Sequence, residues 1–465
     1  MFSKEIYTTR RENLRKQLSG GLILLPGNSD VPFNYPANIY TFRQDSSFLY
    51  FFGIKNPDFA GIIDADSGED FLFGNDLDID DIIWTGEQPS VKELADKCGV
   101  KQTYNFSAVY DFISKAISEG RKIHYLPAYR AQTKLLLEKL LGIPAGEVND
   151  NTSEELIKAV VKLRSVKEPV EIKEIEKALD TAYLMHTTSM KSAVPGVKEQ
   201  EIYGKIEGIA LSYGGPVSFP VILSVNGQIL HNHHHENILK AGQLMITDAG
   251  AETEMHYCSD ITRTTPVGGK FSLKQKEIYE TVLKANTEVI KKSKPGVFYK
   301  DMHLLSAKII AEGLKSVGLM KGDIDDAVEK GAHALFYPHG LGHMMGLDVH
   351  DMEGLGEDYV GYDDTVKRSK LFGTAFLRMA RKLEPGFVVT VEPGIYFIPA
   401  LIDIWKKENK FTEFINYDKL EEYRNFGGIR IEDDILITEN GCKVLGKPIP
   451  KTVEEIENLM SEFIA

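Results

Sequence analysis

The first third of the chain alternates short apolar segments with an amphipathic one. Residues 21–26, 59–65, 70–74 and 122–128 are apolar runs of strand length, and residues 107–120 place apolar side chains at helical spacing. Strands and helices that alternate in this way are typical of an α/β domain. We therefore expect an N-terminal domain of mixed α/β structure.

The pattern becomes strongly helical beyond residue 150. Ser153 is a candidate helix N-cap, and Pro169 suits the first turn of the next helix. Since 465 residues exceed the size at which one hydrophobic core usually stops growing, we predict two domains, residues 1–160 and 161–465. In the second domain, long helices stop at three Pro-Gly pairs, namely Pro195-Gly196, Pro295-Gly296 and Pro385-Gly386.

An aromatic segment, FRQDSSFLYFFG at residues 42–53, stands out in the N-terminal domain. Packing in a core or an interface explains Phe48, Tyr50, Phe51 and Phe52. The alternative is a wall that overlooks a neighbouring active site. No cluster of catalytic residue types accompanies the segment, so we prefer core or interface packing.

Composition narrows the range of functions. The formal charge of −14 disfavours nucleic acid and anionic membranes as partners, because both select clustered Lys and Arg. No apolar run is long enough to span a membrane, and no signal-peptide core follows the N-terminus. Cys98, Cys258 and Cys442 are widely spaced, which indicates reduced thiols in a cytoplasmic protein rather than disulfides or metal ligands.

Five potential metal ligands lie at strand ends and in a Gly-rich loop of the C-terminal half: Asp248, Asp260, His343, Glu392 and Glu432. Four carboxylates in one cavity would repel one another and lose their solvation unless cations neutralised them. Oxygen ligands with a single imidazole suit hard or borderline divalent metals. The sequence therefore predicts a two-metal hydrolytic centre.

The local pattern also predicts where these side chains lie. Asp248 and Asp260 are expected on two adjacent strands, and Glu392 ends an apolar strand. Period-two alternation puts Arg430 and Glu432 on one strand face, so Arg430 can orient the ligand carboxylates.

Histidines are concentrated in two segments. His339 and His343 in PHGLGH have helical spacing, but Pro338 and two intervening glycines favour a tight loop. The run His233 to His235 could bind adventitious metal, although an exposed or cavity-lining loop explains it better.

The segments DAGAETEMHYCSDITRT, HGLGHMMGLDVHD, TVEPGIYF and GGIRIEDDILIT, with YTFRQDSSFLYFFG near the N-terminus, resemble the proline-specific metallopeptidases of the creatinase and methionine aminopeptidase superfamily. Within it the chain is similar to Xaa-Pro aminopeptidases (aminopeptidase P) and Xaa-Pro dipeptidases (prolidases). The resemblance implies an α/β (α+β) protein, with a creatinase-type N-terminal domain followed by a pita-bread catalytic domain of two half-units. The family has one residue fewer between the two aspartates, so an extra residue is expected around residues 253–256.

The resemblance also assigns roles in the metal centre. Asp248 would hold one cation, His343 and Glu392 the other, and Asp260 and Glu432 would bridge the pair. Manganese is the usual ion, with cobalt, zinc or iron as alternatives. The implied nucleophile is a hydroxide that bridges the two cations, with Glu392 as proton shuttle.

Three further histidines match the family pattern. His231 and His350 would polarise the scissile carbonyl and stabilise its oxyanion, and His339 would border the proline subsite. An Xaa-Pro bond has no N–H, so a site can hold a ring where other peptidases need a donor. Tyr337 and Tyr396 are candidates for that ring pocket, although core packing explains each about as well. The implied partners are small proline-containing peptides and a second copy of the chain in a homodimer.

Aminopeptidase P and prolidase share the metal centre and differ in whether the cleft accepts a longer peptide. Arg378 and the long segment between Glu392 and Arg430 are prolidase-like, whereas the N-terminal segments are closer to bacterial aminopeptidase P. A solvated helix arginine is an equal alternative for Arg378. We expect an Xaa-Pro aminopeptidase, with a dipeptidase as the alternative. The large N-terminal domain disfavours a methionine aminopeptidase, and retention of every ligand disfavours both the metal-free creatinase and a catalytically dead pita-bread binding module.

Overall fold

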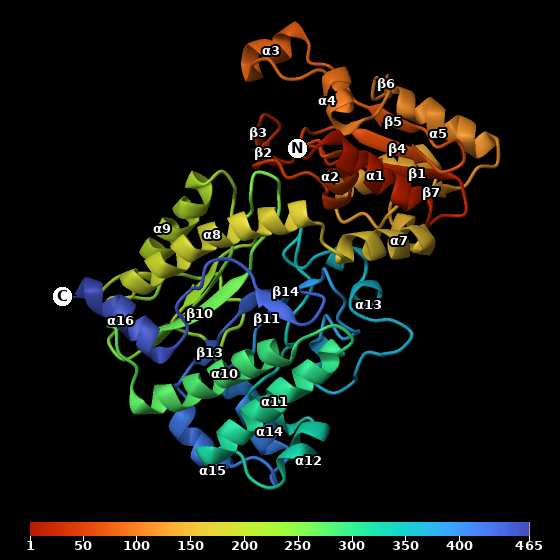
Figure 1. Cartoon of the computed structure of the whole chain (residues 1–465). Coiled ribbons are helices and arrows are strands. Elements are labelled where there is room, and N and C mark those ends of the chain that lie inside the picture. Colours follow the sequence, from red (N-terminus) through yellow and green to blue (C-terminus); the bar gives the residue numbers. More distant parts are fainter. Residues whose placement is uncertain (465) are drawn as a thin grey trace. The chain divides into compact units, whose positions relative to one another are not determined.

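The computed structural model describes residues 1–464, which divide into two compact units (Figure 1). Unit 1 comprises Met1–Arg164 and Glu353–Tyr359; unit 2 comprises Ser165–Met352 and the chain from Val360 onward. The sequence placed the boundary near residue 160, which lies within helix α7 (Glu154–Ser165), whereas the units divide at the end of that helix. Ser153 caps α7, because its Oγ accepts a hydrogen bond from the Leu156 N–H at 3.3 Å.

Unit 1 contains a mixed five-stranded sheet with helices packed on it. The strand order is β6-β5-β4-β1-β7, with β1 antiparallel to β4 and parallel to β7. The predicted α/β class is confirmed. The elements are α1 (Lys4–Arg15), β1 (Leu22–Pro26), β2 (Pro32–Tyr35), β3 (Asn38–Ile39), α2 (Ser46–Phe52), β4 (Ala60–Asp64), β5 (Asp70–Phe73), α3 (Ile79–Thr85), α4 (Val91–Cys98), β6 (Gln102–Tyr104), α5 (Ala108–Ser118), β7 (Ile123–His124), α6 (Ala131–Leu141) and η1 (Val148–Asn151), followed by α7.

Helix α2 carries the aromatic segment into the core of unit 1. Asp45 begins the helix by accepting the Phe48 N–H, and Gly53 ends it in a left-handed conformation with φ 69°. All four aromatic side chains, Phe48, Tyr50, Phe51 and Phe52, are buried. Core packing, the preferred interpretation, is therefore confirmed.

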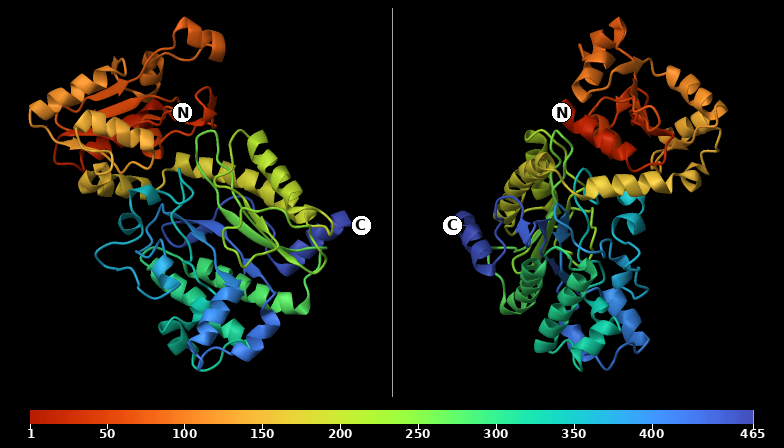
Figure 2. Two further views of the ribbon diagram at one scale, coloured as in Figure 1. Left: turned by 180° about the vertical axis from the view of Figure 1, so that it is seen from behind. Right: turned by 45° about the vertical axis from the view of Figure 1, so that its right-hand side comes forward.

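Unit 2 combines two helix pairs with small antiparallel sheets. Helix α8 (Pro169–Ser192) packs against α9 (Glu199–Ser212), and α10 (Leu273–Lys292) packs against α11 (Tyr299–Ser316), which run side by side in both views of Figure 2. The sheet orders are β10-β9-β8, β11-β14-β15 and β12-β13. Two helix pairs with strand clusters between them agree with the expected pita-bread domain.

The remaining elements of this unit are the strands of its sheets and several shorter helices. They are β8 (Ile222–Ser224), β9 (Leu244–Ala249), β10 (Ile261–Pro266), α12 (Ile324–Glu329), η2 (Ala332–Leu335), η4 (Thr374–Phe376), β11 (Val388–Val391), β12 (Gly394–Tyr396), α14 (Pro399–Lys407), α15 (Tyr417–Leu420), η5 (Glu421–Tyr423), β13 (Gly428–Arg430), β14 (Asp433–Ile437), β15 (Cys442–Val444) and α16 (Val453–Ile464). Two short helices, η3 (Glu353–Leu355) and α13 (Glu357–Val360), fall mainly in the segment assigned to unit 1.

Prolines and glycines lie where helices and strands of unit 2 begin or end. Pro169 is the first residue of α8, where its missing N–H costs no helical hydrogen bond. Gly196 and Gly296 adopt φ of 92° and 83° just after α8 and α10, so these two predicted helix stops are confirmed. Gly386 adopts φ of 89° in the turn before β11, but residues 377–384 are irregular, so the predicted helix stop at Pro385-Gly386 is wrong. Across residues 1–464, no helix is both long and apolar enough to cross a membrane.

Candidate metal centre and active site

Strands β9 and β10 bring two aspartates together. The strands pair antiparallel with Thr262 opposite Asp248, and Asp260 immediately precedes β10. The turn between them, where an extra residue is expected, contains His256 in a left-handed conformation with φ 66°. The His256 Nδ1 lies 2.6 Å from a carboxylate oxygen of Glu252, which holds the turn. The predicted pair of adjacent strands is therefore present.

The two glutamates come from the neighbouring strands. Glu392 directly follows β11, as its apolar run predicted, and Gly394 of β12 pairs with Arg430 of β13. The Glu432 N–H donates to the carbonyl of Thr262 at 3.0 Å, which joins this strand to β10. Arg430 and Glu432 line the same cavity, in agreement with strand alternation.

His343 lies in an irregular loop rather than a helix, as its glycines predicted. The loop passes close to β11, because the His343 N–H donates to Thr390 Oγ1 at 3.1 Å. A Cβ on Gly342 would lie 2.1 Å from the Thr390 carbonyl oxygen, so only glycine allows this approach. The loop thus carries an imidazole to the strands that hold the carboxylates.

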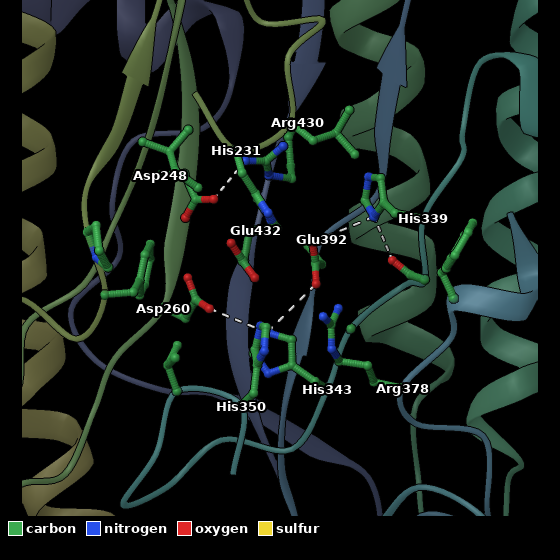
Figure 3. Close-up of a pocket in the computed structure, with 18 of the residues that line it drawn as sticks. His231, Asp248, Asp260, His339, His343, His350, Arg378, Glu392, Arg430 and Glu432 are labelled. Atoms are coloured by element: carbon green, nitrogen blue, oxygen red, sulfur yellow. Dashed lines mark hydrogen bonds and ion pairs between the residues drawn. The ribbon is translucent and has the colours of Figure 1, made fainter. Parts of the chain in front are cut away.

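These segments enclose a cavity of about 290 Å³ (Figure 3). Its polar lining includes every metal ligand and every catalytic residue predicted from the sequence: Asp248, Asp260, Glu392, Glu432, His231, His339, His343, His350 and Arg430, together with Arg378 and His233. Its apolar lining is formed by Phe219, Pro220, Ile222, Leu230, Val349 and Phe376. In Figure 3 the four carboxylates face one another at the centre of the cavity.

The donor set fits divalent cations. Asp260, His343 and Glu432 each offer a ligand atom within 4.8 Å of the others. The Oδ1 atoms of Asp248 and Asp260 are buried and have no hydrogen-bond partner among residues 1–464. Burial, reinforced by the neighbouring carboxylates, raises the pKa of Asp260 and of Glu432 well above the usual range. A bound cation would reverse that shift by stabilising the ionised carboxylates.

His343 is oriented as a ligand. Its Nδ1 lies 3.0 Å from the carbonyl oxygen of Met344, which assigns the proton to Nδ1. The other nitrogen, Nε2, lies 3.4 Å from Asp260 and 3.8 Å from Glu392. Its lone pair therefore faces the carboxylate cluster.

Arg430 connects two of the candidate ligands. It donates to Asp248 Oδ2 at 2.7 Å and to Thr262 Oγ1 at 3.1 Å. Thr262 in turn donates to Glu432 Oε2 at 2.8 Å. Arg430 thus holds one carboxylate directly and a second through Thr262. The sequence interpretation missed Thr262, although strand alternation puts it on the same face as Asp260.

His339 is held as a neutral imidazole. Its Nδ1 donates to the carbonyl of Gly340 at 2.8 Å, and its Nε2 lies 2.9 Å from the hydroxyl of Tyr396. That hydroxyl accepts from Arg430 at 2.8 Å and so donates to His339. Burial, assisted by the positive charge of Arg430, lowers the pKa of His339 to about 3.

Tyr337 and Tyr396 lie behind His339 rather than on the cavity wall. Both side chains are completely buried, and neither belongs to the cavity lining. The aromatic side chains that line the cavity are Phe219 and Phe376, which the sequence interpretation did not single out. The expectation that the two tyrosines form the ring pocket is therefore corrected: they support the wall that His339 forms.

Arg378 lies on the cavity lining. It is half-buried and follows η4 in an irregular segment, so the alternative of a solvated helix arginine is wrong.

The His350 ring lies 4.2 Å from that of His343. Burial, with the positive charge of Arg430, lowers the pKa of His231.

The histidine run forms a loop, as expected. His233 lines the cavity, whereas His235 is buried against Tyr203, with ring centroids 4.4 Å apart. The His235 Nδ1 also lies 2.9 Å from the carbonyl oxygen of Leu223.

The chain matches two family models. Residues 7–124 match the aminopeptidase P N-terminal domain, and residues 173–439 match metallopeptidase family M24. It is 33% identical to human Xaa-Pro dipeptidase over 97% of this chain and 91% of that protein. It is 34% identical to a "probable Xaa-Pro aminopeptidase" of Fusarium vanettenii, over 90% of this chain and 88% of that one.

Solved structures agree with these matches. Aminopeptidase P from E. coli, determined with the inhibitor Pro-Leu, superposes with a TM-score of 0.81 at 30% identity and covers 99% of each chain. A zinc-substituted form of that enzyme in complex with product matches equally well, with a TM-score of 0.81. The family model, the relatives and the shared fold lead to one conclusion: this chain is a hydrolase of metallopeptidase family M24 and belongs to its Xaa-Pro peptidases.

Proposed function

We propose that this chain is an Xaa-Pro aminopeptidase that holds two divalent cations and removes the N-terminal residue from peptides with proline in second position. The observation that carries the proposal is the cavity in which four carboxylates and four histidines of the family pattern converge. Overlap with aminopeptidase P from E. coli along almost the whole chain supports the choice of aminopeptidase.

The cations would be held by Asp248, Asp260, His343, Glu392 and Glu432. When bound, they would lower the pKa of a water molecule and polarise the scissile carbonyl. Manganese is the proposed ion, since the ligands are carboxylate oxygens with one imidazole. A metal-free, inactive binding module is the opposite hypothesis, and metal analysis of the purified protein distinguishes the two.

Glu392 is the proposed proton carrier. Burial raises the pKa of its carboxyl to about 7, and bound cations would lower that pKa. Its carboxylate lies between His343, at 3.8 Å, and His339, at 3.7 Å. His231 and His350, on the same cavity, are the proposed donors to the carbonyl oxygen of the substrate.

Arg378 supports the second candidate, an Xaa-Pro dipeptidase. Its half-buried guanidinium lines the cavity, where it could bind the carboxylate that follows proline in a dipeptide. The sequence relationship to human Xaa-Pro dipeptidase favours the same reading.

One comparison tests the proposal. Manganese-loaded protein is incubated with Gly-Pro and, separately, with Arg-Pro-Pro-Gly, and the two values of kcat/KM are compared. Efficient cleavage of the first bond of the longer peptide establishes an aminopeptidase, and cleavage of Gly-Pro alone establishes a dipeptidase. Cleavage of neither peptide contradicts both.

We also propose a homodimer formed through unit 1. Helix α3 buries none of its residues, and Trp84 on it is 86% exposed. The β2-β3 hairpin exposes further large apolar side chains, Phe33, Tyr35 and Tyr40. Exposed apolar patches mark interaction surfaces, and sedimentation velocity would test this one.

Free thiols at all three cysteines fit the proposed cytoplasmic location.

A further inference from the structure

Four polar side chains outside the cavity lie buried behind His339. His303 and Ser306 belong to α11, His333 belongs to η2, and Tyr337 follows shortly after; each is 0% exposed. Within the described chain, both nitrogens of each imidazole and both hydroxyls lack a hydrogen bond of normal geometry. We name these four residues the polar cluster.

Ring contacts connect the polar cluster to His339, which lines the cavity. The rings of His333 and His303 lie 6.3 Å apart, and those of His303 and Tyr337 lie 5.3 Å apart. The Tyr337 ring meets His339 edge-on, at 5.0 Å and 88°. The hydroxyl of Ser306 lies near the phenol of Tyr337. It lowers the pKa of that phenol and so partly offsets the rise that burial causes.

Polar atoms that lose their hydration in a protein interior need partners. Burial lowers the pKa of His303 to about 3 and that of His333 to about 4, so both imidazoles are neutral. Each side chain of the polar cluster therefore offers a donor and an acceptor, which is the combination that internal water satisfies. A divalent cation suits the cluster less well, because the cluster contains no carboxylate to balance its charge.

We propose that the polar cluster binds internal water and thereby holds Tyr337 as a rigid support for His339, so that its members are positioning residues for recognition of the substrate ring. The inference rests on the proposed function, since it takes His339 as the border of the ring subsite. Water that bridges α11 and Tyr337 would fix the phenol, and the edge of its ring would then restrict the movement of His339.

The first test does not depend on activity. A crystal structure of the full chain, at a resolution that reveals ordered water, should contain water within hydrogen-bond distance of His303 and His333. A dry cluster would overturn the proposal, and so would a metal ion, identified by its anomalous scattering.

The second test measures ring discrimination. Tyr337→Phe and Ser306→Ala each remove one hydroxyl of the polar cluster, and peptides with proline or with the larger pipecolate ring are compared. We expect KM for the proline peptide to rise and the ratio of kcat/KM for pipecolate over proline to increase, by about tenfold, since small misplacements in a site are costly. Tyr337→Phe is the more conservative change. If the Tyr337→Phe variant does not fold, Ser306→Ala is used in its place.

Matched controls exist in unit 2. Tyr279→Phe and Ser293→Ala remove equally buried hydroxyls, which donate to the carbonyls of Lys451 and Val289 away from the cavity. Their ring ratio should equal that of the unmodified chain. An unchanged ratio in the cluster variants refutes the positioning role, even if water is present. If the unmodified chain cleaves no Xaa-Pro peptide, the proposed function fails while the water site is still judged by the crystal structure.

Discussion

Lys167 donates a hydrogen bond to Asp351 at 2.9 Å, and both side chains are 1% exposed. Asp351 directly follows His350, and its N–H donates to the carbonyl of Met344, the residue after His343. One buried ion pair therefore holds the loop that carries two of the candidate active-site histidines. It joins the start of unit 2 to a segment almost two hundred residues later.

Replacing Lys167 tests this relationship. Lys167→Met breaks the buried ion pair on the lysine side, and we expect the free energy of unfolding to fall by about 3–5 kcal/mol. Activity should fall as well, because His350 loses its support. Urea denaturation and kcat/KM measure the two effects. The double variant Lys167→Met/Asp351→Leu should regain most of the stability, and unchanged urea midpoints in the single variant would contradict the argument.

Glu392→Gln should abolish turnover and preserve the fold. The amide keeps the shape of the side chain but cannot carry the proton, and it is a weaker metal ligand. Steady-state kinetics with added manganese, alongside circular dichroism, measure this effect. Glu384→Gln, at a solvent-exposed carboxylate, is the control and should retain full activity. Near-normal hydrolysis by Glu392→Gln would refute the assigned role.

Arg378→Ala should separate short from long substrates. If the guanidinium binds the carboxylate of a dipeptide, kcat/KM for Gly-Pro should fall by about tenfold to a hundredfold, the range of a hydrogen bond to a charged group. Cleavage of Arg-Pro-Pro-Gly should change much less. Equal losses for both peptides would mean that Arg378 does not recognise the carboxylate.

Metal removal should destabilise the chain, because the carboxylates of the cluster would then repel one another. Manganese at a hundred times its dissociation constant should add about 2.7 kcal/mol to the free energy of unfolding. Burial and the neighbouring carboxylates raise the pKa of Asp260, so its ionised form is costly without a cation. Asp260→Asn removes this cost, so we expect the variant to melt above the unmodified chain in a chelator and to lose the gain from manganese. Calorimetry with and without manganese measures both effects. A lower melting temperature for Asp260→Asn in the chelator would contradict the repulsion argument.

Acid should destabilise the chain through its buried neutral imidazoles. Burial holds the pKa of His303 at about 3 and that of His333 at about 4, below the ordinary value of 6.5. Between these values the unfolded chain binds more protons, so this contribution to stability is complete above about pH 6.5 and is lost as the pH falls towards the folded pKa.

Each imidazole can account for up to about 1.4 kcal/mol per pH unit in that window. We expect the melting temperature to fall between about pH 6.5 and pH 4.5, and to fall less steeply in His333→Leu. The exposed His234 provides the control variant, His234→Leu, whose slope should match that of the unmodified chain. Identical slopes in all three proteins would contradict the assignment of His333 as a neutral buried group.

Much of the fold was accessible from local pattern. The apolar runs became β1, β4, β5 and β7, and the helical repeat at residues 107–120 became α5. Ser153 and Pro169 began the predicted helices because capping and proline geometry act within a single turn. The short hairpin β2-β3 went unpredicted, because its strands have only four and two residues and their apolar side chains are exposed rather than packed in a core.

The candidate metal ligands were accessible for a similar reason. Apolar strands are interrupted or ended by Asp248, Glu392 and Glu432. A carboxylate buried at such a position costs free energy unless it is paired or binds a cation. Arg430 could be placed beside Glu432 by period alone. Thr262 was within reach of the same argument, whereas Phe219 and Phe376 carry no local signal that distinguishes a cavity wall from a core.

The sequence by itself determined the α/β class, the candidate ligand set and the family, because each rests on motifs whose residues lie close together within the motif. Only the tertiary structure decided that Tyr337 and Tyr396 stand behind His339 and that Arg378 is not on a helix. It also decided that Arg430 binds Asp248 across 182 residues of sequence. The physical reason is that burial and side-chain pairing depend on which distant segments pack together, and local pattern does not specify that packing.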